Sequence, residues 1–191
     1  MWPFGKKKEK VDLYDVRTQA LEKALGPMHD MVIHAVIPFF AGFDMGGRAD
    51  VYIFKQHLDG VVYVTGDLLG EKQKQSDAGN YELMICHKTD SDWGPRLISA
   101  LAYYTLDEPI NSGETMDIGD AAGPDTEITA FLFNKYTELD FMGKKAGLML
   151  CVGITPQELE YSQKHGGKQL IEALVRSGVY PFTDLKRTSV V

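Results

Sequence analysis

The sequence has few of the features that mark secreted, membrane-spanning or disulfide-stabilised proteins. It contains only two cysteines, Cys86 and Cys151, and each lies in an apolar run where a buried free thiol is expected rather than a structural disulfide. No segment approaches the roughly 20 apolar residues of a membrane span. The lysines near the N-terminus are not followed by an apolar stretch, so they do not form a secretory signal. We therefore expect a cytoplasmic protein that does not bind a membrane.

Positive charge is also in short supply. Lysine and arginine number 20 against 27 aspartate and glutamate residues, which gives a net charge of −7. An acidic chain repels phosphate backbones, so general nucleic-acid binding is disfavoured. The same charge favours solubility and attraction to a basic partner.

Motifs that carry catalysis or metal binding are missing as well. The five histidines include no pair three or four residues apart on a predicted helix, so no metal site and no cofactor are expected. Cys86 and His87 are adjacent on a predicted strand and point to opposite faces, which argues against a nucleophile–base pair. We expect a protein that is not an enzyme. A hydrolase that uses Cys86 or Cys151 with a histidine brought close by folding remains an alternative.

The sequence predicts one α+β domain with helices packed on a largely antiparallel or mixed sheet. A length of 191 residues with 44% hydrophobic content is enough for one core. We expect a flexible N-terminus over residues 1–11, a domain over 12–185 and a loose tail over 186–191. Helices are predicted over 12–25, from 91 or 92 to about 108, and over 156–165 and 168–176. Asp12 can cap the first helix, whose Leu13, Val16, Ala20 and Ala24 fall on one face, and Thr155 to Glu158 form a capping box before the third. Strands are predicted over 31–37, 50–54, 61–65, 81–87, 128–133 and 147–154, with exposed loops over 66–79 and 111–125. Between the second and third strands, Asp59-Gly60 can supply the positive φ of a turn.

Aromatic and acidic side chains gather on two neighbouring strand candidates and the loop after the first. Tyr63, Asp67, Glu71 and Glu82 suggest a groove for a basic or aromatic peptide, and Tyr63, Asp67 and Glu82 are our predicted partner-binding residues. If Tyr63 and Glu82 belong to such a groove, both should be partly exposed while Leu83 and Ile85 are buried. The alternation of Glu82 with Leu83 along the strand allows this for Glu82. The competing interpretation is an inward Glu82 that is paired within the fold.

Four segments in order resemble the suppressor of fused family, from about Val32 to Leu185. They are DVYIF with YVTG (50–54 and 63–66), YELMI (81–85), WGPRLI with LAY (93–98 and 101–103), and ITP with Glu158, Leu159, Tyr161, His165, Gly166 and Leu170. Members of the family often have Gly-His-Thr where this chain has Gly113-Glu114-Thr115, so no role of that histidine can be transferred.

The resemblance implies a protein-binding module. Animal members have two domains and restrain a zinc-finger transcription factor, whereas single-domain bacterial relatives are proposed to be immunity proteins that neutralise a cognate toxin. In the animal members a partner peptide binds as an added strand beside aromatic and acidic side chains, and the matching positions here are Tyr63 and Glu82. The expected partner is another protein, of which a toxin is one candidate. A structural, oligomer-forming domain remains a third possibility, and the oligomeric state is open.

Overall fold

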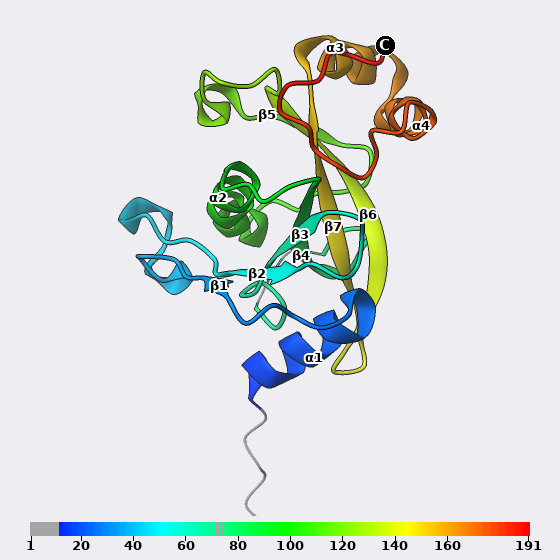
Figure 1. Ribbon diagram of the computed structural model, residues 1–191. Helices are drawn as coiled ribbons and strands as arrows, with labels where there is room; N and C mark the ends of the chain where they lie inside the picture. Colours follow the sequence, from blue (N-terminus) through cyan, green and yellow to red (C-terminus); the bar gives the residue numbers. More distant parts are fainter. Residues whose placement is uncertain (1–11, 72, 74) are drawn as a thin grey trace, which may run out of the picture.

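The computed structural model describes residues 12–71, 73 and 75–191 (Figure 1). The expected flexible N-terminus over residues 1–11 lies outside the described residues. None of the helices within the described part of the chain is long and apolar enough to span a membrane.

The described strands form one seven-stranded sheet in the order β1-β2-β3-β4-β7-β6-β5. Neighbouring strands are antiparallel except for β4 and β7, which are parallel. This arrangement confirms the predicted α+β class with a mixed, mostly antiparallel sheet. The strands are β1 (Val32–Ile33), β2 (Val51–Phe54), β3 (Val61–Thr65), β4 (Asn80–His87), β5 (Thr115–Asp117), β6 (Ala130–Phe141) and β7 (Lys144–Ile154).

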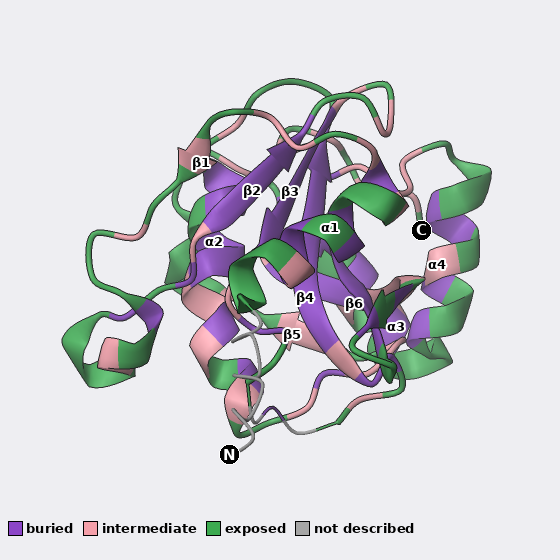
Figure 2. Ribbon diagram, turned by 90° about the horizontal axis from the view of Figure 1, so that it is seen from below, coloured by how far each residue is buried: buried purple, intermediate pink, exposed green. Residues whose placement is uncertain are grey.

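Helices cover both faces of the sheet, as Figures 1 and 2 show. Side chains of one alternation, such as Tyr63 and Ile85, pack with helix α2 (Trp93–Leu101) and the short helix η3 (Ala102–Leu106). Side chains that point to the opposite face of the sheet, such as Val62 and Met84, pack with α1 (Leu13–Leu25) and α4 (Gly167–Arg176). Because both faces are covered, the central strands are buried along nearly their whole length.

Helix α1 begins and ends where the sequence predicts. The Asp12 side chain accepts the N–H of Tyr14 at 3.0 Å, and Gly26 ends the helix with a φ of 83°. Of the four residues that helical spacing places on one face, Ala20 is buried, Val16 and Ala24 pack against the core, and Leu13 is exposed. The helix also buries Arg17, Thr18, Leu21 and Leu25.

Helix α3 (Pro156–His165) starts with the predicted capping box, in which Thr155 and Glu158 exchange hydrogen bonds with each other's backbone. Glu158 is fully buried and also pairs with Arg187, whose Nη2 lies 2.6 Å from Oε2. The N–H of Val190 reaches the same carboxylate at 3.1 Å. The C-terminal tail over 186–191 is therefore tied to the domain and is not loose as expected.

Two hairpins depart from the sequence prediction. The β6–β7 hairpin extends through residues 134–146, which the sequence pattern does not assign to strands, and the three-residue β5 lies inside the expected loop over 111–125. In the β2–β3 hairpin, Gly60 does not adopt the expected positive φ. A Cβ there would lie 2.5 Å from the carbonyl oxygen of His87 and 2.7 Å from the Phe182 ring, so close packing requires the glycine.

The segment over 66–79 is not the exposed loop that its polar composition suggests. Leu68, Leu69, Gln73 and Ala78 are buried within it. Its first half folds down against α1 and β4, and this packing shapes the candidate site.

Candidate functional site

A cleft of about 680 Å³ lies between the start of the 66–79 segment, helix α1 and residues 34–40. We call it the acidic cleft. Its side chains combine three carboxylates with three aromatic rings, namely Asp50, Asp67, Glu71, Phe39, Phe40 and Tyr103.

Glu82 lies behind one wall of the acidic cleft and supports the loop that forms it. Its side chain is fully buried, and Oε1 accepts the backbone N–H groups of Leu68 and Leu69 at 2.9 and 2.7 Å. Oε2 accepts the hydroxyl of Thr65 at 2.6 Å. Burial raises the pKa of the Glu82 carboxyl to about 8, while these hydrogen bonds act in the opposite direction. Glu82 therefore fixes the backbone of the loop that carries Asp67 and Glu71.

Arg17 of α1 holds the same loop from the other side. Its guanidinium donates to the carbonyl oxygens of Leu69 and, at 3.3 Å, Gly66. It also lies 3.9 Å from the Asp67 carboxylate and 3.6 Å from that of Glu71. These contacts explain why an arginine occupies the buried face of α1, since its charge and donors are matched by loop acceptors.

Negative charge exceeds positive charge in the acidic cleft. Asp67 accepts the backbone N–H of Asp50 at 2.8 Å, and both carboxylates line the cleft. Burial raises the pKa of the Asp67 carboxyl, and the charges of Asp50 and Glu71 raise it further. Arg17 is the one arginine or lysine among the described residues that line the cleft, and His34 adds a ring nitrogen 2.7 Å from Asp50. A cationic group entering here would meet three carboxylates and gain charge-assisted hydrogen bonds.

Beside the cleft, a loop over 38–48 presents large apolar side chains to solvent and projects beyond β1 (Figure 1). The two ends of the loop are joined by a hydrogen bond from the N–H of Arg48 to the carbonyl oxygen of Ile37 at 3.2 Å. The Tyr103 ring packs against those of Phe39 and Phe43 at 6.0 and 6.4 Å. Exposed fractions are 88% for Phe40, 67% for Phe43 and 64% for Met45 in the loop, and 99% for Val36 just before it. Apolar side chains gathered in this way mark a surface for interaction.

The structure separates the predicted site residues. Glu82 and Asp67 come together through the loop, but Tyr63 pairs with Ile85 in the register and packs on the α2 face, opposite to Glu82. The expected partial exposure of Tyr63 and Glu82 is wrong, because they are 2% and 0% exposed. The Tyr63 hydroxyl accepts the N–H of Ser91 at 3.0 Å and lines a separate hollow on that side.

The two thiols lie in settings that disfavour a nucleophile. Both Cys86 and Cys151 are fully buried, and burial raises the pKa of Cys86 to about 12 and that of Cys151 further still. His87 packs on the α2 face against Trp93, and its Nδ1 lies 2.9 Å from the carbonyl oxygen of Thr183, whereas Cys86 belongs to the opposite face. The strand alternation that argued against a Cys86–His87 pair is confirmed. In the part of the chain that the structure describes, no group of three potential ligands could hold a metal ion.

Several cleft residues were missed from the sequence. Arg17 lies within the predicted helix over 12–25 and Asp50 at the start of the predicted strand over 50–54, and the sequence pattern singled out neither as a site residue. Phe39 and Phe40 form an adjacent aromatic pair beside Gly42, which is the one sequence signal that could have identified the projecting loop.

Several solved structures have a fold similar to that of this chain. The chain resembles one in the crystal structure of the Sufu–Fu complex, with a TM-score of 0.69, 12% identity and coverage of 93% of this chain and 91% of that one. It resembles a suppressor of fused homologue from Neisseria gonorrhoeae with a TM-score of 0.66, 14% identity and coverage of 94% and 97%. Suppressor of fused from Drosophila also gives 0.66 and 14%, with coverage of 93% of this chain and 50% of that one.

The solved structures show a shared fold at low sequence identity. No curated protein sequence matches the chain. The sequence profile of the suppressor of fused protein family matches residues 48–188, which include β2 to α4 and therefore Asp50, Asp67 and Glu82. The chain belongs to the suppressor of fused family.

Proposed function

We propose that this chain is a non-catalytic protein-binding module whose partner contacts the acidic cleft and the projecting loop over 38–48. The observation that supports the proposal most strongly is the juxtaposition of exposed Phe40 and Val36 with a cleft that holds Asp50, Asp67 and Glu71. Apolar anchors beside carboxylates suit a partner segment with basic and aromatic side chains. The chain of the Sufu–Fu complex that this fold resembles is itself part of a protein complex.

Glu82 has a different role in this proposal from the one that its sequence position suggested. It does not touch the partner. It holds the N–H groups of Leu68 and Leu69, so that Asp67 and Glu71 stand at the cleft with little freedom to move. Binding then orders few additional groups, which favours affinity.

Photo-crosslinking tests the proposal and captures the partner in the same step. Benzoylphenylalanine replaces Phe40 in the full chain, which is then irradiated in its native cells, and Val175 on the outer side of α4 carries the same group as a control. Val175 is 54% exposed and therefore also accessible to the solvent. We expect a specific adduct from position 40 that is missing from position 175. Equal adducts from both positions, or none from either, would contradict the proposal.

The same experiment separates the alternatives. An adduct at twice the mass of the 21.3-kDa chain would favour the oligomer-forming interpretation. An adduct with a different protein would favour the binding module.

A finer proposal is that the partner is a toxin that this chain neutralises. Its support is chemical: a net charge of −7 and a three-carboxylate cleft complement a basic protein surface. The homologue from Neisseria gonorrhoeae is also spanned over 97% of its length by this single domain. Co-expression with the product of the neighbouring reading frame tests it. We expect the wild-type chain to restore growth and the double variant Asp67→Asn, Glu71→Gln to fail. A neighbouring product that is not toxic, or a wild-type chain that does not restore growth, would contradict the proposal.

A further inference from the structure

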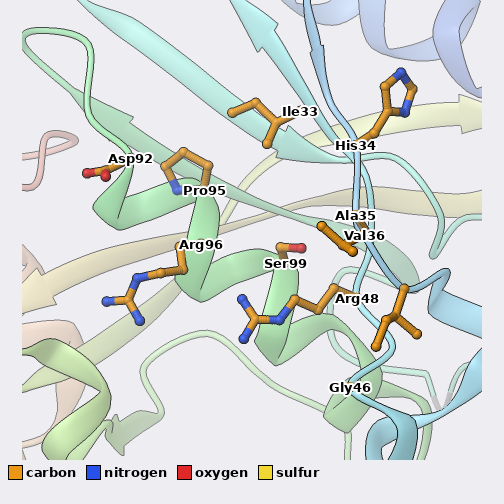
Figure 3. A pocket seen from close by; sticks show the side chains of 11 residues that line it. Ile33, His34, Ala35, Val36, Gly46, Arg48, Asp92, Pro95, Arg96 and Ser99 are labelled. Atoms are coloured by element: carbon orange, nitrogen blue, oxygen red, sulfur yellow. The ribbon is translucent and has the colours of Figure 1, made fainter.

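A second cleft, of about 560 Å³, lies on the other side of residues 33–37, between that segment and helix α2 (Figure 3). We call it the basic cleft. It shares His34 and Ala35 with the acidic cleft and is otherwise lined by different residues. Its apolar walls come from Ile33, Val36, Ile37 and Pro95.

Two arginines line this cleft. Arg48 and Arg96 are both exposed, and Figure 3 shows both side chains near Ser99. Arg96 donates one N–H to the carbonyl oxygen of Ala121 at 2.9 Å. The Arg48 side chain makes no hydrogen bond or ion pair with any residue that the structure describes. Asp92 is the one carboxylate among the described lining residues, so the formal charges of the cleft sum to one positive charge, opposite in sign to the acidic cleft.

The backbone positions of the two arginines are fixed relative to each other. The N–H of Ala49 donates to the carbonyl of Ser99 at 3.2 Å, and the Ser99 hydroxyl donates to the carbonyl of Ala49 at 2.5 Å. These two bonds join the residue after Arg48 to α2, one helical turn after Arg96. The N–H of Arg48 also holds the opposite wall through the Ile37 carbonyl. These hydrogen bonds fix the walls of the basic cleft, so the cleft is preformed in the absence of a ligand.

We propose that the basic cleft binds a side-chain carboxylate of an extended partner segment, with a neighbouring aliphatic or aromatic side chain packed on Ile33, Val36 and Pro95. Guanidinium groups with free N–H donors match a carboxylate in geometry and charge. A single negative charge balances the cleft, whereas the second charge of a phosphate group would meet Asp92. That the occupant belongs to a protein rests on the proposed function.

The opposite charges of the two clefts favour one orientation of a partner segment that crosses residues 34–37. Basic groups are favoured on the side of Asp67 and Glu71, and acidic groups on the side of Arg48 and Arg96. A segment that crosses residues 34–37 in the reverse direction brings like charges together at both ends.

A display library of short linear peptides, selected on the full chain, tests the inference. Selected peptides are synthesised, and their affinity is measured by fluorescence anisotropy for the wild type, Arg48→Gln, Arg96→Gln and the matched surface control Lys164→Gln. We expect peptides in which Asp or Glu adjoins an aliphatic or aromatic residue. Each arginine substitution should weaken their binding roughly tenfold, because a charge-assisted hydrogen bond is lost. Lys164→Gln should leave it unchanged.

Peptide variants make the assignment specific. Replacing the peptide's acidic residue by its amide should cost as much as Arg48→Gln, and the two changes together should cost less than their sum. Enriched peptides without a carboxylate, a failure to enrich any peptide, or affinities unaffected by both arginine substitutions would overturn the inference. Tighter binding of a phosphoserine version would overturn the assignment to a carboxylate. Peptides that respond to Glu71→Gln but to neither arginine substitution would leave the proposed function standing and remove this inference alone.

Discussion

Glu82 Oε1 and the backbone nitrogen of Leu69 lie 2.7 Å apart, so a fully buried carboxyl group holds the loop that forms one wall of the acidic cleft. On the other side of that loop, Arg17 donates to the carbonyl of the same Leu69. The loop is thus fixed through both its N–H and C=O groups by side chains from β4 and α1. Asp67 and Glu71 take their positions from this arrangement.

Glu82→Gln should change how stability depends on pH. The pKa of Glu82 is about 8 in the folded chain against 4.5 as its ordinary value, so between these two values the unfolded chain releases a proton that the folded chain keeps. The free energy of unfolding of the wild type should then fall by up to ~1.4 kcal/mol per pH unit in this window relative to the variant, which cannot titrate. Urea denaturation between about pH 5 and 8 measures the difference. A wild-type advantage that grows with pH would contradict the raised pKa.

Leu97→Ala should destabilise the domain by about 2–5 kcal/mol, because Leu97 is buried in the cluster between α2 and the sheet and its loss leaves a cavity. Phe40→Ala is the control, since the Phe40 ring is exposed and its removal should change stability by no more than about 0.5 kcal/mol. Chemical denaturation of both variants and the wild type measures these changes in the free energy of unfolding. Equal midpoints for Leu97→Ala and the wild type would mean that the packing of α2 is misassigned.

Arg187→Ala should cost about 3–5 kcal/mol, since it leaves the buried Glu158 carboxylate without its charged partner. Lys23→Ala, which breaks the exposed pair of Lys23 with Asp140, should cost no more than about 1 kcal/mol. If the two variants unfold at the same denaturant concentration, the C-terminal tail does not stabilise the fold in the way its contacts indicate.

Both thiols should resist a maleimide or disulfide reagent in the native protein at neutral pH. Cys86 and Cys151 are buried and their pKa values are raised by burial, so little thiolate is accessible. Mass spectrometry after brief labelling should find unmodified chain under native conditions and two labels after unfolding. Rapid native labelling would revive the cysteine-dependent hydrolase alternative.

Features that depend on neighbouring residues could be predicted from the sequence, whereas those that depend on long-range packing could not. The Thr155–Glu158 capping box and the Asp12 cap are local, and both form as expected. The alternation of Glu82 against Leu83 was also correct. What the pattern could not show is that α1 and the loop over 66–71 cover the second face of the sheet as well.

Two other errors have the same origin. The burial of Arg17 on α1 was missed because its acceptors, the carbonyl oxygens of Gly66 and Leu69, lie far along the chain. Tyr63 and Glu82 looked like one groove because each lies on a strand beside the other, but the register puts them on opposite faces. The acidic cleft is lined by residues from five segments between Arg17 and Leu106, so a single sequence does not reveal it.

The central claim is that the acidic cleft binds a protein partner through its carboxylates. The most direct test is titration calorimetry of the partner captured at position 40 against the wild type and the double variant Asp67→Asn, Glu71→Gln, at low and at physiological salt. We expect the double variant to remain folded, to lose about 1.5–3 kcal/mol of binding free energy and to be less sensitive to salt. An unchanged Kd in a folded double variant would contradict the account.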